Sequence, residues 1–366
     1  MTVVVTGAAG HLGGNLVRAL LARGHRVRAL DYTRDWRALE GLDLERVEAD
    51  VRDPAALQRA FAGADVVYHT AAIISLSRHD WPLLEAVNVL GTRNVVEACL
   101  ECGVRRLVHV SSIHALVQEP LGVPIDETCP LVTSRRNPPY DRSKAAGERE
   151  VRRGIERGLD AVILNPTGMI GPYDYRPSFF GSVLLALGQG TLPALVNSGF
   201  DWVDVRDVAE GAIAAAERAP AGSKYLLSGH WVSMRDLAVL VRQITGARVP
   251  WFTSPMWLAR LAAAFSDALP RRKVQRNVLT GVSLAALRGN RRISHERATR
   301  ELGYHPRPLR ETLWDIYLWF EAAGRLAVPV TGHPRPRTLE EALGLTRPLT
   351  NPFASLKGRT DEAGNQ

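Results

Sequence analysis

The 366-residue chain has few cysteines and few lysines, and each shortage excludes something. Three cysteines cannot build a disulfide framework. Cys99 and Cys102 are spaced C-x-x-C, but no second ligand pair accompanies them, so this stretch favours an ordinary amphipathic helix over a metal or redox site. Only four of the 46 Lys and Arg residues are lysine, which makes arginine the default cation. A lysine at a particular position in this chain therefore suggests that the position requires an ammonium group rather than a guanidinium group.

The chain also lacks a long apolar run. No stretch of about 18 apolar residues occurs, so we expect no membrane span. The nearest candidate, 250–273, contains charged residues and leaves open a weak peripheral membrane contact, a lid or an oligomer interface. The chain starts with MTVVVTG rather than a basic and then apolar leader, so we expect a cytoplasmic protein. The net charge of +8 comes from scattered arginine doublets, which argues against nucleic-acid binding.

The first 165 residues alternate short β-branched runs with helical patterns. The expected strands are TVVVTG, HRVRALD, ERVEAD, DVVYHTAA, RLVHVSS and DAVILNP. Several are apolar almost throughout, as strands buried on both faces should be. This alternation predicts an α/β fold, a doubly wound parallel sheet with helices on both faces. A later strand near residue 201 is expected to feed a helix capped by Asp207.

Three glycines, Gly7, Gly10 and Gly13, lie between the first expected strand and the helix that follows it. In this context one glycine makes a tight turn, another lets backbone N–H groups approach a pyrophosphate, and the third allows close packing of helix on strand. The loop, with His11 and Leu12, therefore predicts a Rossmann-type dinucleotide site. No metal site is expected.

Asp31 ends the second strand, 18 residues after the last of these glycines. A carboxylate there can bond the adenosine ribose and repel a 2′-phosphate, so NAD is favoured over NADP. Arg34 and Arg37 lie nearby in the sequence, so binding of the 2′-phosphate of NADP stays an open alternative. Asp50 and Val51 follow the third strand and are placed to border the adenine.

Tyr140 and Lys144 stand one helical turn apart in NPPYDRSKAAGERE. With 8 Tyr and four Lys in the chain, chance would give roughly 0.09 such pairs. Hydride transfer to a carbonyl needs a proton donor on the oxygen, which we assign to Tyr140. The neighbouring ammonium of Lys144 would lower the tyrosine pKa. Ser112, after the fifth strand, would hold the substrate oxygen, with Ser111 as the alternative.

The order of these motifs, with HTAA, NVLGTRNVVEAC, NPTGMIGP and ELGYHPRPLRETL, resembles the extended short-chain dehydrogenase/reductase superfamily, or NAD-dependent epimerase/dehydratase family. The resemblance runs from Thr2 to about Phe320. It implies that Ser112 is the catalytic hydroxyl and that Lys144 bonds the nicotinamide ribose. Further cofactor contacts are expected from Ala71, Ala72, Asn88, Asn165, Pro166 and Thr167. For Asn88 the resemblance leaves a structural or a relay-like role open, and we assign it no catalytic role.

Asn165 and Ile170 in LNPTGMIGP depart from the sugar-nucleotide epimerase pattern and favour the dihydroflavonol-reductase and 3β-hydroxysteroid-dehydrogenase-like branch. The fold expected is a Rossmann-type sheet with a smaller, mainly helical C-terminal substrate lobe. Its NAD(P)-binding domain would take 1–165 and about 201–230. The substrate-binding lobe would take 166–200 and 231–330, leaving 331–366 as an extended, partly disordered tail. A homodimer, common in the superfamily, stays open.

The predicted function is an NAD(P)-dependent oxidoreductase that interconverts a carbonyl and a secondary alcohol on a small, fairly apolar substrate. Candidate pocket residues are Ile73, Ile74, Met169, Phe179, Phe180 and Trp202. An NAD-dependent nucleotide-sugar epimerase or dehydratase would use the same catalytic residues. A catalytically silent dinucleotide-binding protein would have a disrupted set, whereas Ser112, Tyr140 and Lys144 are all present. Substrate, reaction direction and stereochemistry stay open.

Overall fold

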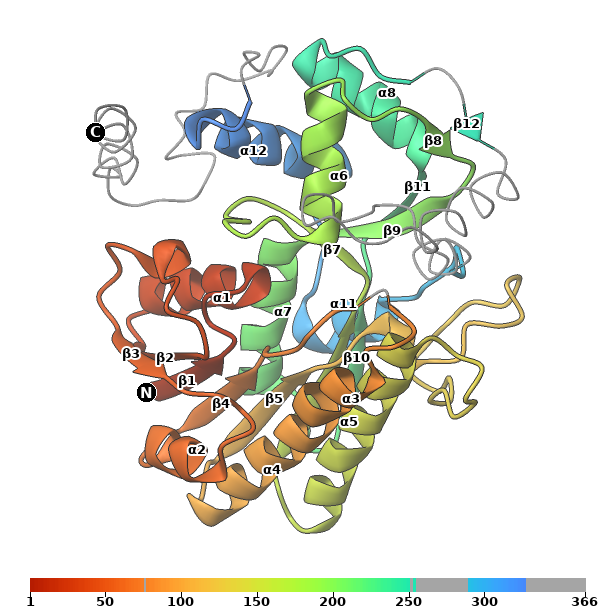
Figure 1. Cartoon of the computed structure of the whole chain (residues 1–366). Coiled ribbons are helices and arrows are strands. Elements are labelled where there is room, and N and C mark those ends of the chain that lie inside the picture. The colour runs from red at the N-terminus through yellow and green to blue at the C-terminus, as the bar shows by residue number, and fades with distance from the viewer. Residues whose placement is uncertain (76, 251–252, 255–288, 327–366) are drawn as a thin grey trace.

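The computed structural model describes residues 1–75, 77–250, 253–254 and 289–326 (Figure 1). Its centre is a seven-stranded sheet in the order β10-β6-β5-β4-β1-β2-β3, with every neighbouring pair parallel. The strands are β1 (Thr2–Thr6), β2 (Arg26–Asp31), β3 (Glu45–Glu48), β4 (Val66–His69), β5 (Arg106–Val110), β6 (Ala161–Pro166) and β10 (Lys224–Leu227). The first six are the strands expected from the sequence.

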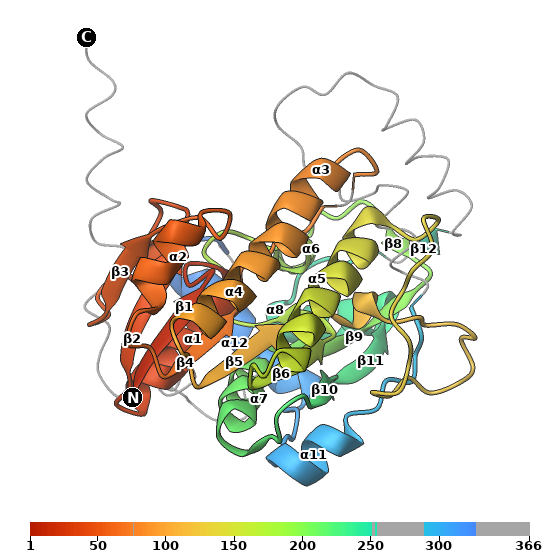
Figure 2. The same ribbon diagram turned by 90° about the horizontal axis from the view of Figure 1, so that it is seen from below.

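Helices cover both faces of this sheet (Figures 1 and 2). One face carries α1 (His11–Ala22) and α7 (Val205–Arg218), and the other carries α2 (Pro54–Phe61), α4 (Thr92–Glu101) and α5 (Pro139–Glu156). Alternate residues of a strand enter opposite cores, since Val3 and Val5 pack with Leu16 whereas Val4 packs with Leu57. The predicted doubly wound α/β fold is confirmed.

A continuous helical stretch precedes β5. It runs from α3 (Trp81–Leu84) through a π-helical segment, η2 (Glu85–Gly91), into α4. Cys99 is buried within α4 and Cys102 is its C-terminal cap, so the C-x-x-C spacing belongs to the helix. Short 3₁₀ turns occur at η1 (Arg37–Leu39) and η3 (Ile113–Ala115).

A second lobe lies beyond the carboxyl ends of the central strands (Figure 1). It holds a three-stranded sheet in the order β11-β9-β7 and a two-stranded sheet of β12 and β8. Its elements are β7 (Gly168–Ile170), α6 (Phe179–Gly188), β8 (Leu195–Val196), β9 (Gly199–Asp204), β11 (His230–Ser233), α8 (Met234–Thr245), β12 (Thr253–Ser254) and α12 (Leu309–Ala322). Except for β12, these elements contribute to a separate apolar core around Leu184, Leu237 and Tyr317.

The chain crosses between the lobes at the β9–α7 junction. Strand β9 belongs to the small sheet, whereas α7, β10 and α11 (Glu296–Leu302) pack on the large one. The prediction that Asp207 is the N-cap of α7 is wrong. Asp204 caps α7 by accepting a hydrogen bond from the Arg206 amide at 2.8 Å, while Asp207 pairs with Arg307. The two-domain division itself stays a prediction.

Two predicted segments fall largely or wholly outside the described residues. These are 250–273, proposed for a membrane or interface contact, and the tail 331–366. Within the part of the chain that is described, no helix combines the length and apolarity needed to cross a bilayer.

Candidate active site

The glycine loop forms a tight backbone cradle at the end of β1. Gly7 has a φ of +68°, and a Cβ added there would lie 2.7 Å from Ala71 Cα. A Cβ at Gly13 would lie 2.2 Å from Gly7 O, so only glycine lets α1 start this close to the strand. Gly10 caps α1 in an extended conformation. These residues leave backbone N–H groups and a helix N-terminus available to a pyrophosphate, so the loop fits a dinucleotide.

The residues beside the cradle are held by other parts of the fold. His11 Nε2 lies 3.1 Å from Pro172 O, which ties α1 to the segment after β7. Leu12 is buried in the core. Ala71 faces Gly7 through its backbone, and Ala72 is exposed.

Asp31 is buried where β2 ends. Its Oδ2 accepts from the Ala9 amide at 2.9 Å and its Oδ1 from the Thr33 amide at 3.1 Å. Burial raises the pKa of Asp31, and these backbone donors offset part of that effect. The carboxylate is therefore already oriented against the glycine loop.

The two residues expected at the adenine lie close to Asp31. Asp50 pairs with Arg52 at 2.6 Å, and this ion pair lowers the pKa of Asp50. Val51 is buried, and its carbonyl accepts from Asn94 Nδ2 at 3.1 Å.

Tyr140 lies in the first turn of α5 and faces the end of β5. Burial raises the pKa of Tyr140 to about 12, although a hydrogen bond with the Ser112 side chain acts in the opposite direction. The His114 ring packs edge-on against the Tyr140 ring with centroids 5.9 Å apart. Ser112 Oγ also accepts from the His114 amide at 3.2 Å. Tyr140 is thus a neutral phenol beside a fixed hydroxyl.

Lys144 lies one turn along α5 and points to the same strand end. Its Nζ donates to Val110 O at 2.8 Å. Burial lowers the pKa of Lys144 to about 8, while the Glu148 carboxylate acts to raise it. Burial of the phenol dominates the pKa of Tyr140, and the Lys144 ammonium is not among the groups that shift it. The expectation that Lys144 lowers this pKa together with an oxidised nicotinamide stays a prediction.

Glu148, one further turn along α5, lies beneath these residues and was not foreseen. Its Oε2 accepts from Ser111 Oγ at 3.1 Å and from Asn165 Nδ2 at 3.2 Å, and its Oε1 lies 2.6 Å from Lys224 Nζ. Burial acts to raise the pKa of Glu148, but these cationic and amide partners outweigh it and the pKa is lowered. The Ser111 hydroxyl is therefore turned to Glu148, which leaves Ser112 as the hydroxyl bonded to Tyr140.

Asn165 connects the buried Glu148 carboxylate to the backbone of Ser112. Its Nδ2 also donates to Ser112 O at 2.9 Å, and its buried Oδ1 has no hydrogen-bond partner in the described structure. The following residue, Pro166, ends β6 beside Leu227. Thr167 Oγ1 donates to Asp201 Oδ1 at 2.7 Å.

Asn88 lies in the π-helical segment η2 and holds the loop after β4. Its Oδ1 accepts from the Ile73 amide at 2.8 Å, and its Nδ2 donates to Ile73 O at 2.9 Å and to Ser143 Oγ at 3.0 Å. Both ends of this side chain are thus occupied by the protein. In this structure Asn88 positions the loop that follows Ala71.

A second unforeseen residue, Arg176, reaches the glycine loop from the segment after β7. Its Nη2 donates to Ala9 O at 3.0 Å. Its positive charge offsets part of the rise in the pKa of Asp31 that burial causes. Sequence signals for the missed residues were slight. Glu148 continues the Tyr140, Lys144 spacing, and Lys224 is one of few lysines, but nothing local links Glu148 to Lys224 or Arg176 to the glycine loop.

The apolar pocket candidates divide between surface and core. Ile74 is 65% exposed and Trp202 only 1% exposed, so Trp202 belongs to the lobe's core. Phe180 packs edge-on against Trp202 with centroids 4.9 Å apart. The others, Ile73, Met169 and Phe179, are partly buried.

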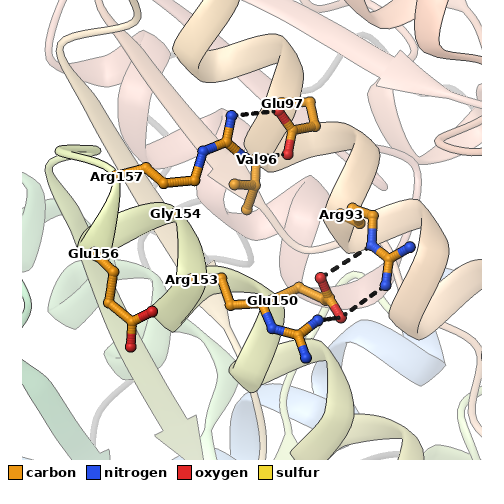
Figure 3. A pocket seen from close by; sticks show the side chains of 8 residues that line it. All are labelled: Arg93, Val96, Glu97, Glu150, Arg153, Gly154, Glu156 and Arg157. Carbon is orange, nitrogen blue, oxygen red and sulfur yellow. Dashed lines mark hydrogen bonds and ion pairs between the residues drawn. The ribbon is translucent and has the colours of Figure 1, made fainter.

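A shallow pocket of about 340 Å³ lies away from this chemistry, on the outer surface of α4 and α5 (Figure 3). Its charged residues neutralise one another. Arg93 bonds Glu150 at 3.0 and 3.1 Å, Arg153 bonds Glu150 at 2.7 Å, and Arg157 pairs with Glu97. We assign it no catalytic role.

Comparison with known proteins identifies the group to which this arrangement belongs. Residues 3–228 match the model of the NAD dependent epimerase/dehydratase family. The chain belongs to this family. Sterol demethylase protein B of Methylococcus capsulatus is 37% identical over 329 residues, which cover 89% of this chain and 100% of that protein. A dihydroflavonol 4-reductase-like protein of Synechocystis is 32% identical over 327 residues, with 87% and 94% covered.

The similarity extends to three dimensions. The crystal structure of gox2253 superposes with a TM-score of 0.78 at 37% identity and covers 89% of this chain and 99% of that one. The predicted family and dihydroflavonol-reductase-like branch are confirmed. The chain is an enzyme of the extended short-chain dehydrogenase/reductase superfamily, whose members bind an NAD(P) dinucleotide and act on small molecules.

Proposed function

We propose that the enzyme interconverts a carbonyl and a secondary alcohol, with Tyr140 as the acid/base. The observation that carries this proposal is the pairing of Tyr140 with Ser112 at the end of β5. The phenol is protonated at neutral pH, and burial, which raises its pKa to about 12, reinforces that state. Tyr140 can therefore donate a proton to a carbonyl oxygen in the reducing direction.

The roles of the other residues follow from their positions. Ser112 holds the substrate oxygen beside Tyr140. Lys144, anchored on Val110 O, carries a positive charge below about pH 8 and lies on the same helical face as Tyr140. The bound dinucleotide supplies or accepts the hydride. The proposed cofactor contacts are those given above: Gly7, Gly10, His11, Leu12, Gly13, Asp31, Asp50, Val51, Ala71, Ala72, Asn88, Tyr140, Lys144, Asn165, Pro166 and Thr167.

The proposed cofactor preference is NAD over NADP. Asp31 is fixed by two backbone donors, so its carboxylate is oriented to accept from a ribose hydroxyl and to repel a 2′-phosphate. The two arginines that are candidates to bind a 2′-phosphate are already paired, Arg34 with Glu48 at 3.0 Å and Arg37 with Asp35 at 2.7 Å. Both pairs are exposed, so this pairing weakens rather than removes a 2′-phosphate site.

The substrate that we propose is small and fairly apolar where it meets Tyr140. Among the candidate pocket residues, Ile74 is exposed and Ile73 and Met169 are partly exposed, so they are available to an apolar substrate. The names of the similar proteins, a sterol-modifying protein and a dihydroflavonol reductase-like protein, agree with a fairly apolar substrate.

The proposal is tested by supplying the enzyme with NADH and a panel of ketones and aldehydes and following the absorbance of the reduced nicotinamide. We expect NADH consumption matched by alcohol formation. The rival function, sugar-nucleotide epimerisation, predicts dinucleotide retained through purification, interconversion of epimers, and no net NADH consumption. That second pattern would overturn the oxidoreductase assignment.

A further inference from the structure

His114 contacts both Ser112 and Tyr140, the two hydroxyl residues of the proposed active site. Its backbone N–H donates to Ser112 Oγ at 3.2 Å, and its imidazole packs edge-on against the Tyr140 ring with centroids 5.9 Å apart. Among the residues that the structure describes, His114 is the only one whose aromatic ring packs against that of Tyr140. One residue therefore connects the hydroxyl that follows β5 to the phenol at the start of α5.

The imidazole is held in turn by Asp141, the residue after Tyr140. Its Nδ1 lies 3.4 Å from Asp141 Oδ1, and both side chains are largely buried, with 28% and 18% exposure. A carboxylate only accepts hydrogen bonds, so it favours a proton on the facing Nδ1 and fixes which edge of the ring turns to Asp141. Asp141 lies in the first turn of α5, and the imidazole is therefore tied to the same helical turn as the phenol.

The backbones on both sides of this contact are held by other bonds. His114 lies in η3, where the flanking Ile113 and Ala115 are buried and Ala115 O accepts from the Val132 amide at 2.9 Å. The carbonyl of Tyr140 accepts from Ser143 Oγ at 2.8 Å. These bonds leave the phenol ring free to turn about its own side-chain bonds, and the packed imidazole restricts that rotation.

We propose that His114, anchored by Asp141, is a positioning residue that holds the Tyr140 phenol against Ser112, so that both hydroxyl groups meet one substrate oxygen. For this role the imidazole neither exchanges a proton nor touches the substrate. A catalytic group misplaced by about 1 Å can cost on the order of 10²-fold in rate. The link to catalysis rests on the proposed function, whereas the orientation of the ring does not.

The first test replaces His114 and measures NADH-dependent reduction of a carbonyl compound from the panel above. His114→Ala should lower kcat at least roughly tenfold and leave the NADH Kd within about twofold of wild type. His114→Phe restores an aromatic ring and should recover kcat to within about threefold of wild type. The matched control, His305→Ala, removes an exposed imidazole elsewhere and should change neither value. Equal losses in the alanine and phenylalanine variants would assign the role to the imidazole nitrogens and overturn the proposal.

Asp141→Asn separates position from charge. The Asp141 carboxylate acts to raise the pKa of Tyr140, so loss of its charge alone would make the phenol a stronger acid and would not slow proton donation. Loss of the anchor predicts the opposite sign, with kcat lowered about threefold. In the His114→Phe background the same substitution should not lower kcat, because that ring has no nitrogen to anchor. Equal losses in both backgrounds would show that Asp141 does not act through His114.

A measurement without turnover separates the position of Tyr140 from the proposed reaction. In the NADH-saturated full-length protein labelled with meta-fluorotyrosine, Tyr140→Phe identifies the fluorine NMR line of Tyr140 by its disappearance. This line should be markedly broader or split in His114→Ala and narrow in wild type and His114→Phe. An unchanged line in His114→Ala would overturn the proposal. If the line responds as expected but no carbonyl compound is reduced, the proposed function fails while the positioning of the ring stands.

Discussion

Lys224 Nζ lies 2.6 Å from Glu148 Oε1, and both side chains are buried, at 6% and 0% exposure. The pair joins β10 at the edge of the sheet to the middle of α5, directly beneath Ser111 and Asn165. Since Asn165 also bonds Ser112 O, the position of Ser112, the proposed catalytic hydroxyl, depends on a buried carboxylate.

Removing one member of this pair should be costly. Lys224→Met leaves buried Glu148 with only the partly exposed Arg152, 3.1 Å away, as an ion-pair partner, so the free energy of unfolding should fall by about 3 kcal/mol. Adding Glu148→Gln removes the stranded charge and should recover part of that loss. The matched control is Arg34→Met, which breaks the exposed pair with Glu48 and should cost less than about 1 kcal/mol. Urea unfolding measures all four; equal losses for Lys224→Met and Arg34→Met would contradict the account.

The titration of Lys144 should be visible in stability. Burial lowers its folded pKa to about 8 from an ordinary value of 10.5. Between these values the unfolded chain binds one more proton than the folded one, so stability rises with pH across this window. From pH 8 to 10, wild type should gain about 2–3 kcal/mol relative to Lys144→Met. The variant has no such group, and a constant difference in unfolding free energy between the two would contradict the buried ammonium.

Neighbouring glycines in the cofactor loop should respond oppositely to alanine. A Cβ at Gly13 would lie 2.2 Å from Gly7 O, whereas one at Gly14 would meet its nearest atom, Arg18 Nη1, at 3.6 Å. Gly13→Ala should therefore displace the loop and weaken NADH binding at least roughly tenfold. Gly14→Ala should bind NADH normally and gain about 0.5–1 kcal/mol of stability from the helix. Fluorescence titration of NADH decides, and normal binding by Gly13→Ala would remove the loop from the site.

The cofactor preference depends on Asp31. Asp31→Ser removes the carboxylate that we propose faces the adenosine ribose, so the ratio of the NADP Kd to the NAD Kd should fall roughly tenfold. Asp43→Ser, which removes the same charge from an exposed position, should leave the ratio unchanged. Because burial raises the pKa of Asp31, acidification should weaken the preference in wild type but not in Asp31→Ser. An unchanged ratio in Asp31→Ser would contradict the assignment.

The sequence was sufficient where the signal is local. The run from Thr2 to Gly13 predicts strand, turn and helix because the sterics that require glycine act within a few residues. Likewise the spacing of Tyr140 and Lys144 puts both on one face of α5.

It was insufficient where distant segments meet. Glu148 and Lys224 are 76 positions apart, and nothing in either segment predicts that β10 pairs with β6 so as to bury them together. The raised pKa of Tyr140 has the same origin, because desolvation depends on the whole fold rather than on the lysine one turn away. The predicted N-cap of α7 was wrong even though the two candidates are close in sequence. Asp204 and Asp207 are both suitable N-cap residues, and only the position at which β9 ends and α7 begins selects Asp204.

The most direct measurement compares Tyr140→Phe with wild type in NADH-dependent reduction of an identified carbonyl substrate. The phenyl ring keeps the packing against His114 but cannot donate a proton. The account predicts a kcat lowered by about 10²–10⁴-fold, with the NADH Kd within about threefold of wild type. Turnover within about threefold of wild type would show that the proton comes from another group.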